Sequence, residues 1–232
     1  MLKPEELAKM IDHTLLKPYS TDEDLKNLCK AAREYNFKTV AINNCHIPLC
    51  NRELEGTDVL TDAAVGFPLG AMTIEAKVFE AEDAIEKGAG EVDYVVNIGK
   101  VKSGDWAYVR DEMRRIVDAC HRHGIICKVI FENCYLNDEE KRMLCRIAVE
   151  TGIDFIKTST GMGSGNATLE DVMLMKQCVG SKVRVKAAGG IRSAADALKF
   201  IEAGASRLGT SAGKAIIDEY REMLRSTGTT LD

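Results

Sequence analysis

Asp-Phe-Ile-Lys-Thr-Ser-Thr-Gly, residues 154–161, is a short strand pattern that runs directly into a glycine turn and carries a lysine near its end. Val-Arg-Val-Lys-Ala-Ala-Gly-Gly, residues 183–190, has the same arrangement. An ammonium group at such a position is costly unless its charge or its nucleophilicity is used. The two segments therefore indicate both a repeated strand-and-turn unit and a site that depends on amines.

The whole chain alternates between β-rich runs and amphipathic helical patterns. The expected strands are 10–15, 38–43, 59–66, 91–97, 126–132, 153–158, 183–188 and 205–209. The expected helices are 21–35, 47–54, 74–87, 105–123, 138–150, 168–179, 193–203 and 211–224, with N-caps at Thr21, Asp138, Thr168, Ser193 and Ser211. Eight strand-helix units in 232 residues predict an α/β fold, the (β/α)8 TIM barrel. A doubly wound open sheet is the alternative.

Length and composition predict one domain that spans residues 1–232, with 225–232 as a flexible tail. The net charge of -5 argues against a nucleic-acid or anionic-membrane partner. The N-terminal segment lacks the pattern of a secretory signal, which predicts a cytoplasmic protein. Its eight scattered cysteines are expected to be reduced thiols. The four histidines do not combine with other ligands at metal-binding spacings, so we expect no metal.

Strand period predicts an unusually charged barrel interior. If Tyr94 and Val96 face the helices, Asp93 and Val95 turn inward. Similar phasing turns five further charged side chains inward, which are Asp12, Lys128, Lys157, Arg184 and Lys186. A barrel interior is normally filled by branched apolar residues, so this set indicates a polar site at the C-terminal ends of the strands.

Two lysines held close together would make one of them a nucleophile. A free lysine has a pKa of about 10.4, so only about 0.04% is amine at pH 7. A second ammonium about 5 Å away, at an effective dielectric of about 20, lowers that pKa by about two units, and burial acts in the same direction. The amine can condense with an aldehyde, and the protonated imine then permits cleavage of the bond β to it. With Asp93 to move protons, the set suits an aldolase.

Glycine turns after the last two strands indicate a phosphate site at the same rim. Gly189-Gly190-Ile191-Arg192-Ser193 precedes one helical pattern, and Leu208-Gly209-Thr210-Ser211-Ala212-Gly213 precedes another. Backbone amides at the N-terminus of a helix bind phosphate, and this location in a barrel is a frequent phosphate site. Thr158 and the residues up to Gly161 could add amides or hydroxyls. The expected substrate is a phosphorylated aldehyde or sugar.

Five segments resemble the deoxyribose-phosphate aldolases, namely residues 11–18, 65–70, 91–99, 155–161 and 185–192. The resemblance implies that Lys157 is the Schiff-base lysine, Lys186 its perturbing neighbour and Asp93 the proton-transfer carboxylate, with no metal or organic cofactor. It implies reversible cleavage of 2-deoxy-D-ribose 5-phosphate to D-glyceraldehyde 3-phosphate and acetaldehyde. The implied phosphate site is Gly161, Gly189, Gly190, Ile191, Arg192, Gly209, Ser211 and Ala212. Asp12, Thr14 and Lys17 would lie near the sugar, although a structural hydrogen bond is an equal alternative for Asp12.

The chain also departs from the family pattern. Val40-Ala41-Ile42-Asn43-Asn44 stands where the family usually has Val-Cys-Val-Asn-Pro, which removes a thiol near the site and a turn proline. Met162 stands where bulkier or basic residues are common, so the sequence does not predict the shape of the pocket. The C-terminus lacks the tyrosine found in many relatives, and an assisting role for the tail is not expected.

Two other functions remain as alternatives. One is an imine-forming aldolase of the same fold that acts on a different phosphorylated sugar. The other is a phosphate-ligand binding protein without catalysis, against which the retention of both lysines and Asp93 counts. A homodimer is the partner arrangement we expect, because barrels of this type often pair.

Overall fold

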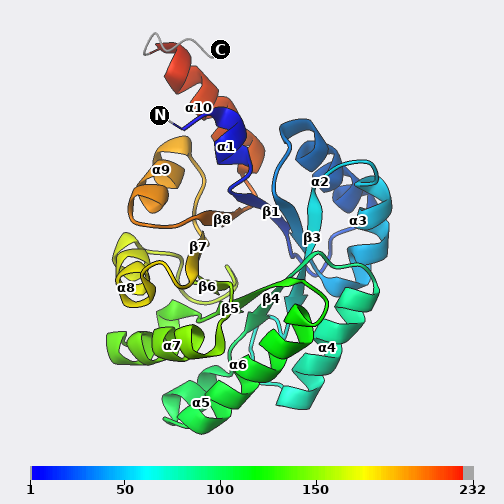
Figure 1. Cartoon of the computed structure of the whole chain (residues 1–232). Helices are drawn as coiled ribbons and strands as arrows, with labels where there is room; N and C mark the ends of the chain where they lie inside the picture. Colours follow the sequence, from blue (N-terminus) through cyan, green and yellow to red (C-terminus); the bar gives the residue numbers. More distant parts are fainter. Residues whose placement is uncertain (1, 227–232) are drawn as a thin grey trace.

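The computed structural model describes residues 2–226, and its eight strands form one closed barrel in sequence order (Figure 1). The strands are β1 (Ile11–Leu15), β2 (Thr39–Ile42), β3 (Leu60–Val65), β4 (Glu91–Val95), β5 (Ile126–Ile130), β6 (Phe155–Lys157), β7 (Arg184–Ala188) and β8 (Arg207–Thr210). All neighbouring strands are parallel, and β1 pairs with β8 to close the ring. The predicted (β/α)8 barrel is confirmed, and the open sheet is wrong because an open sheet has no such closing pair.

Helices surround the barrel on its outside (Figure 1). They are α1 (Pro4–Ala8), α2 (Asp22–Tyr35), α3 (Ile47–Glu53), α4 (Ile74–Glu86), α5 (Ile98–Lys102), α6 (Trp106–His121), α7 (Asp138–Thr151), α8 (Leu169–Val179), α9 (Ala194–Glu202) and α10 (Gly213–Ser226), with 3-10 turns η1 (Asn44–His46) and η2 (Asn133–Tyr135). The sequence did not predict α1 and α5, because a helix of five residues is too short to show a periodic pattern.

Side-chain caps begin most of these helices. Thr21, Thr168 and Ser193 are confirmed as N-caps, since each side chain accepts a hydrogen bond from a backbone N–H of the first turn. The predicted cap Asp138 is wrong, because the Asn137 side chain caps α7 and Asp138 is already helical. Ser211 lies two residues before the first residue of α10. Of the tail predicted at 225–232, residues 225 and 226 end α10, and residues 227–232 lie outside the described part of the chain.

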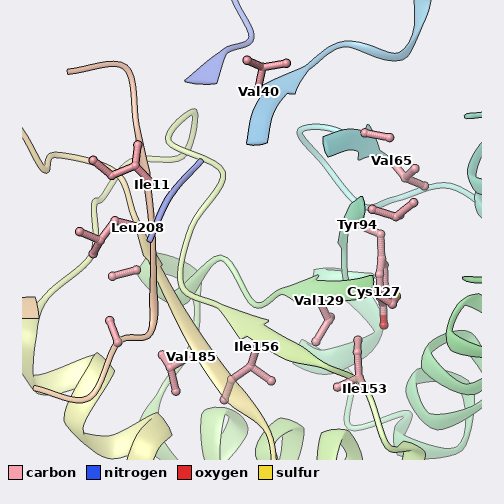
Figure 2. Packing of buried hydrophobic residues seen from close by; sticks show 14 of the residues in the cluster. Ile11, Val40, Val65, Tyr94, Cys127, Val129, Ile153, Ile156, Val185 and Leu208 are labelled. Carbon is pink, nitrogen blue, oxygen red and sulfur yellow. The ribbon is translucent and has the colours of Figure 1, made fainter. Parts of the chain in front are cut away.

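The apolar core lies between the barrel and its helices. Figure 2 shows buried residues of this core; Ile153 lies just before β6, and the other labelled residues, Ile11, Val40, Val65, Tyr94, Cys127, Val129, Ile156, Val185 and Leu208, lie on strands. Tyr94 and Val96 are fully buried in this layer, as strand period predicted. Because successive strand side chains point to opposite faces, the residues that alternate with them fill the inside of the barrel.

Phe155 begins β6 and lies two residues before Lys157, so both side chains face the inside of the barrel. Its side chain is buried, and the guanidinium groups of Arg184 and Arg207 lie 4.0 Å and 5.0 Å from the centre of its ring. Within residues 2–226 no helix has the length and apolar character needed to cross a membrane, and none of the eight cysteines forms a disulfide.

Candidate active site

Lys157 and Lys186 lie on neighbouring strands, β6 and β7, where they are direct register partners. The Nζ atom of Lys157 lies 2.6 Å from Oδ2 of Asp93, and the Nζ atom of Lys186 lies 2.7 Å from the same oxygen. The two nitrogens are therefore no further apart than the sum of these distances. Lys157 is 3% exposed and Lys186 is fully buried. The structure thus brings the three proposed catalytic residues together and shields them from bulk water.

These three residues belong to a larger group that we call the interior charge cluster. It contains the carboxylates Asp12, Asp62, Glu91 and Asp93 and the cations Lys128, Lys157, Lys186 and Arg207. All eight side chains are buried and come from seven of the eight strands. Four negative charges therefore face four positive charges, and the cluster is neutral when every member is ionised.

The contacts within the cluster link its members into a continuous network. Lys186 contacts Asp12 and lies 2.9 Å from Asp62, besides its contact with Asp93. Lys128 lies 2.9 Å from Asp62 and 2.7 Å from Asp93. Arg207 bridges Asp12 at 2.7 Å and Glu91 at 2.9 Å, and Glu91 also lies 2.8 Å from Lys128. Because partners satisfy each buried charge, the interior can hold this many ions.

The two lysines differ in their affinity for protons. Burial is the largest cause that lowers the pKa of Lys157; the carboxylate of Asp93 opposes it, and the charge of Lys186 adds to the lowering. Burial alone would also lower the pKa of Lys186, but Asp12, Asp62 and Asp93 together raise it above its ordinary value. Lys157 is therefore the amine that loses its proton more easily, while Lys186 stays charged. Burial therefore lowers the pKa of Lys157 more than the repulsion by Lys186 does.

Asp93 is the carboxylate that joins both lysines. Burial would raise its pKa, but Lys128, Lys157 and Lys186 hold the pKa of Asp93 well below the ordinary value. Asp93 is consequently ionised at neutral pH and accepts hydrogen bonds from both lysines. When Lys157 becomes an uncharged amine, one of the three cations is lost and the proton affinity of Asp93 rises.

Three carboxylates of the cluster are close enough to hold a metal ion. Ligand oxygens of Asp12, Asp62 and Glu91 all lie within 4.8 Å of one another. Each of these groups, however, already pairs with Lys128, Lys186 or Arg207. Cations of the protein therefore match their negative charge, and the arrangement does not require a metal.

A cavity of about 410 Å³ opens above Lys157. Ten of the residues predicted for the site line it, which are Thr14, Lys17, Lys157, Gly161, Gly189, Gly190, Ile191, Arg192, Gly209 and Ser211. Asp12, Asp93, Thr158, Lys186 and Ala212 are not among its lining residues. Of the three proposed catalytic residues, Lys157 alone lines the cavity, and Asp93 and Lys186 contact one another behind it.

Hydrogen bonds explain why three predicted residues lie away from the cavity. Asp12 is fully buried and pairs with Lys186 and Arg207, which favours its structural alternative. Thr158 is tied to the backbone of Ala188, which it contacts through both the N–H and the carbonyl oxygen. The amide of Ala212 donates to Oγ1 of Thr210 at 2.9 Å, so that N–H is already used.

One end of the cavity has the character of an anion site. Gly189 and Gly190 have φ angles of +93° and +79°, which turn the backbone before α9 in a way that L side chains rarely adopt. Lys17 and Arg192 line the same cavity and supply positive charge. This end therefore suits a phosphate group, and the amine of Lys157 lines the same cavity.

Sequence reasoning assigned no role to several residues of the site. Asn166 lines the cavity, and its side chain lies against Gly189 and Gly190, so that a Cβ added to either glycine would come within 3.1 Å of it. Glu132, at a φ of 55°, accepts a hydrogen bond from the amide of Thr160 at 3.2 Å and so holds the loop after β6. No sequence period reveals Asn166 or Glu132.

Strand period could have found the missed charges. Glu91 lies two residues before Asp93 on β4, so both side chains face inward. Asp62 of β3 is the register partner of Glu91, and Arg207 of β8 is that of Lys186. The alternation along the strands therefore indicated that Asp62, Glu91 and Arg207 face inward. They were not predicted because a barrel interior is usually filled by apolar side chains.

The residues that depart from the family pattern lie around the cavity or next to the cluster. Ala41 is buried on β2, in register with Thr14 and Asp62. The side chain of Asn44 donates to Glu80 at 3.0 Å, which holds the turn after β2 without a proline. Met162 lines the cavity and is 43% exposed. The C-terminal residues lie outside the described part of the chain.

The family model, the two relatives and the solved structure described here are all aldolases. A family model described as DeoC/LacD family aldolase matches residues 7–219. A deoxyribose-phosphate aldolase of Caldanaerobacter subterraneus subsp. tengcongensis is 54% identical over 96% of this chain and 98% of its own length, and one of Thermococcus gammatolerans is 50% identical over 93% and 97%. Among solved structures, the tetrameric deoxyribose phosphate aldolase from Aeropyrum pernix has a TM-score of 0.89 and 32% identity, over 96% of this chain and 94% of that one.

Proposed function

Because the chain belongs to the DeoC/LacD family of aldolases, we propose that it reversibly cleaves 2-deoxy-D-ribose 5-phosphate to D-glyceraldehyde 3-phosphate and acetaldehyde through an imine on Lys157. Relatives at about half identity carry the name deoxyribose-phosphate aldolase over nearly the full chain, which supports the choice of substrate. The observation that carries the mechanism is the shared Oδ2 atom of Asp93, which holds both lysine nitrogens within hydrogen-bonding distance.

The reaction begins with the amine of Lys157. Its Nζ lone pair attacks C1 of the open-chain sugar, and the resulting carbinolamine loses water to give a protonated imine. Asp93 accepts the ammonium proton of Lys157 through their 2.6 Å contact, and Lys186 keeps its positive charge beside them. Lys157 lines the cavity and is buried, so the attack takes place where few water molecules compete.

Cleavage then breaks the bond between C2 and C3. A base removes the proton of the C3 hydroxyl, the C2–C3 electron pair moves toward the imine, and glyceraldehyde 3-phosphate leaves. The remaining two carbons form an enamine on Lys157, which is protonated at C2 and hydrolysed to acetaldehyde and free amine. Because Asp93 does not line the cavity, a water molecule between it and the substrate must carry these protons. The loss of charge on Lys157 in the enamine makes Asp93 more basic when it is needed.

The other end of the cavity binds the phosphate in this proposal. The turn at Gly189 and Gly190 and the residue Ser211 offer polar groups, and Lys17 and Arg192 offer positive charge. Binding there places C1 of a five-carbon chain toward Lys157 and so sets the orientation of the sugar. We also propose that identical chains assemble, because the Aeropyrum pernix relative is described as tetrameric.

Reductive trapping tests the proposal directly. Incubation with acetaldehyde and borohydride should attach one ethyl group to Lys157, which peptide mass spectrometry would locate. The matched control is Lys157→Ala, which should show no adduct at this position and no turnover. Cleavage of 2-deoxyribose 5-phosphate should then be compared with that of other sugar phosphates. If the adduct forms but another sugar phosphate is cleaved faster, the substrate is wrong and the mechanism stands; if no lysine is modified, both are wrong.

A further inference from the structure

Asp62 is a buried carboxylate to which the proposed reaction gives no role. It lies on β3 and is 1% exposed. Its Oδ2 atom accepts a hydrogen bond from Nζ of Lys186 at 2.9 Å, and its Oδ1 atom lies 2.9 Å from Nζ of Lys128. Asp62 does not line the cavity, so it does not contact substrate. Any effect on the reaction has to pass through its neighbours.

Those contacts connect Asp62 to the reacting nitrogen in three steps. Lys157 donates to Asp93 at 2.6 Å, Lys186 donates to the same oxygen at 2.7 Å, and Lys186 also donates to Asp62 at 2.9 Å. Lys186 also contacts Asp12, so its positive charge is divided among three carboxylates, two of which lie on this path. The part of the positive charge of Lys186 that Asp62 compensates no longer attracts Asp93 or repels the ammonium group of Lys157.

Charge balance indicates why this connection matters. With every member of the interior charge cluster ionised, its four cations match its four carboxylates. The reactive state of Lys157 is uncharged, so its formation leaves one buried negative charge in excess. Burial and the negative charge of Asp93 raise the pKa of Asp62 to about 6, against the opposing effect of Lys128 and Lys186. Asp62 is thus a carboxyl group that can be protonated near neutral pH and remove the excess.

We propose that Asp62 is a positioning residue for the amine of Lys157, which acts through Lys186 and controls whether Lys157 holds or releases its proton. When Asp62 is ionised, it compensates the charge of Lys186, and the ammonium form of Lys157 is favoured. When Asp62 is neutral, the charge of Lys186 is compensated less, by Asp12 and Asp93 alone, and it favours the free amine of Lys157. The inference rests on the proposed function only in taking Lys157 as the imine-forming residue.

Other charges face Asp62 and have to be considered in its titration. Lys186 approaches it from β7 and Lys128 from β5, while Asp93 approaches from β4 and Asp12 from β1. Glu91, the register partner of Asp62 on β4, is held by Arg207 and Lys128. Asp12 and Glu91 do not contact Lys157, and Asp12 is held by Arg207 as well as by Lys186. Asp62 is distinguished from Asp12 by its raised pKa, and from Glu91 by its contact with Lys186.

The decisive variant is Asp62→Asn, which keeps the size and the acceptor toward Lys186 but removes the charge. We expect the acid limb of the pH–rate profile to move downward by about one pH unit. Borohydride trapping of acetaldehyde on Lys157 should show the same shift. A purely structural role would lower the rate equally at every pH and leave the midpoint unchanged, and that result would overturn the inference.

Glu91→Gln is the matched control, because it removes one carboxylate charge from the same cluster without contact to Lys186. It should move the midpoint less than Asp62→Asn does, and an equal shift would overturn the route through Lys186. If Asp62→Asn does not fold, Asp62→Ser removes the charge with a smaller side chain and is measured in the same way.

An infrared titration separates this inference from the proposed function, because it needs no turnover. In the wild-type protein, the carbonyl stretch of the protonated Asp62 carboxyl group should appear as the pH falls through about 6. The spectrum of Asp62→Asn should lack this band. Trapping on Lys157 with an unchanged midpoint would reject the role of Asp62 and leave the aldolase mechanism intact. The carboxyl band without any trapping would reject the mechanism, and with it the role of Asp62 in that mechanism.

Discussion

Replacement of Lys186 by methionine should make the enzyme dependent on alkaline pH. The two lysine nitrogens share one acceptor oxygen and so lie no further apart than the sum of 2.6 Å and 2.7 Å, and at this limit an effective dielectric of about 20 gives a repulsion of about 3 kcal/mol. Removal of this charge raises the pKa of Lys157 by up to about two units. The fraction of free amine at pH 7, and with it kcat/KM, should fall by up to about 100-fold.

The assay is the rate of glyceraldehyde 3-phosphate formation from 2-deoxyribose 5-phosphate, measured from pH 5.5 to pH 10 for both proteins. The loss in Lys186→Met should be largest near neutral pH and should shrink as the pH approaches the raised pKa of Lys157. A loss by the same factor at every pH would refute the reasoning, because Lys186 would then act in some way other than through its charge.

Stability has to be followed in the same experiment. Lys186→Met leaves three buried carboxylates with one partner fewer, which costs about 3 to 5 kcal/mol when a buried pair is broken. The double variant with Asp62→Asn restores equal numbers of positive and negative charges in the cluster. It should unfold at a higher temperature than Lys186→Met alone, which thermal unfolding would check.

Four further predictions concern single substitutions. Lys157→Ala should abolish turnover and keep a native circular dichroism spectrum; residual turnover would assign the imine to another lysine. Gly190→Ala, at a φ of +79° and with its Cβ 3.1 Å from Asn166, should raise KM for the phosphorylated sugar about tenfold and leave cleavage of unphosphorylated 2-deoxyribose unchanged. The pKa of Asp62 is raised from 3.8 to about 6, so its contribution to stability is present below pH 4 and is lost as the pH rises through 6; relative to Asp62→Asn, the wild-type protein should lose about 3 kcal/mol of unfolding free energy over this range, and parallel curves would contradict the assignment. Ala41→Cys should be inactivated by unsaturated aldehydes faster than the wild-type protein, and equal rates would refute a role for the missing thiol.

Much of the fold follows from local sequence patterns. Alternation along β4 was sufficient to place Tyr94 in the helix layer and Asp93 inside the barrel, because side-chain direction in a strand depends only on its period of two. The glycine turn after β7 was recognisable for a similar reason, since the positive φ angles of Gly189 and Gly190 are a local demand of the backbone. The short helices α1 and α5 escaped prediction because five residues contain too little periodic information.

The sequence by itself predicted that Asp93, Lys157 and Lys186 face inward, and its family motifs singled out the two lysines as the proposed reactive pair. Only the tertiary structure decided how their charges are compensated. Asp62 lies far from Lys186 along the chain, and closure of the barrel brings the two side chains to 2.9 Å. Burial, which is the largest cause of the lowered pKa of Lys157, likewise arises only when all eight strands surround it. Electrostatic energy depends on distance in space and on exclusion of water, and neither quantity can be read from spacing along the chain.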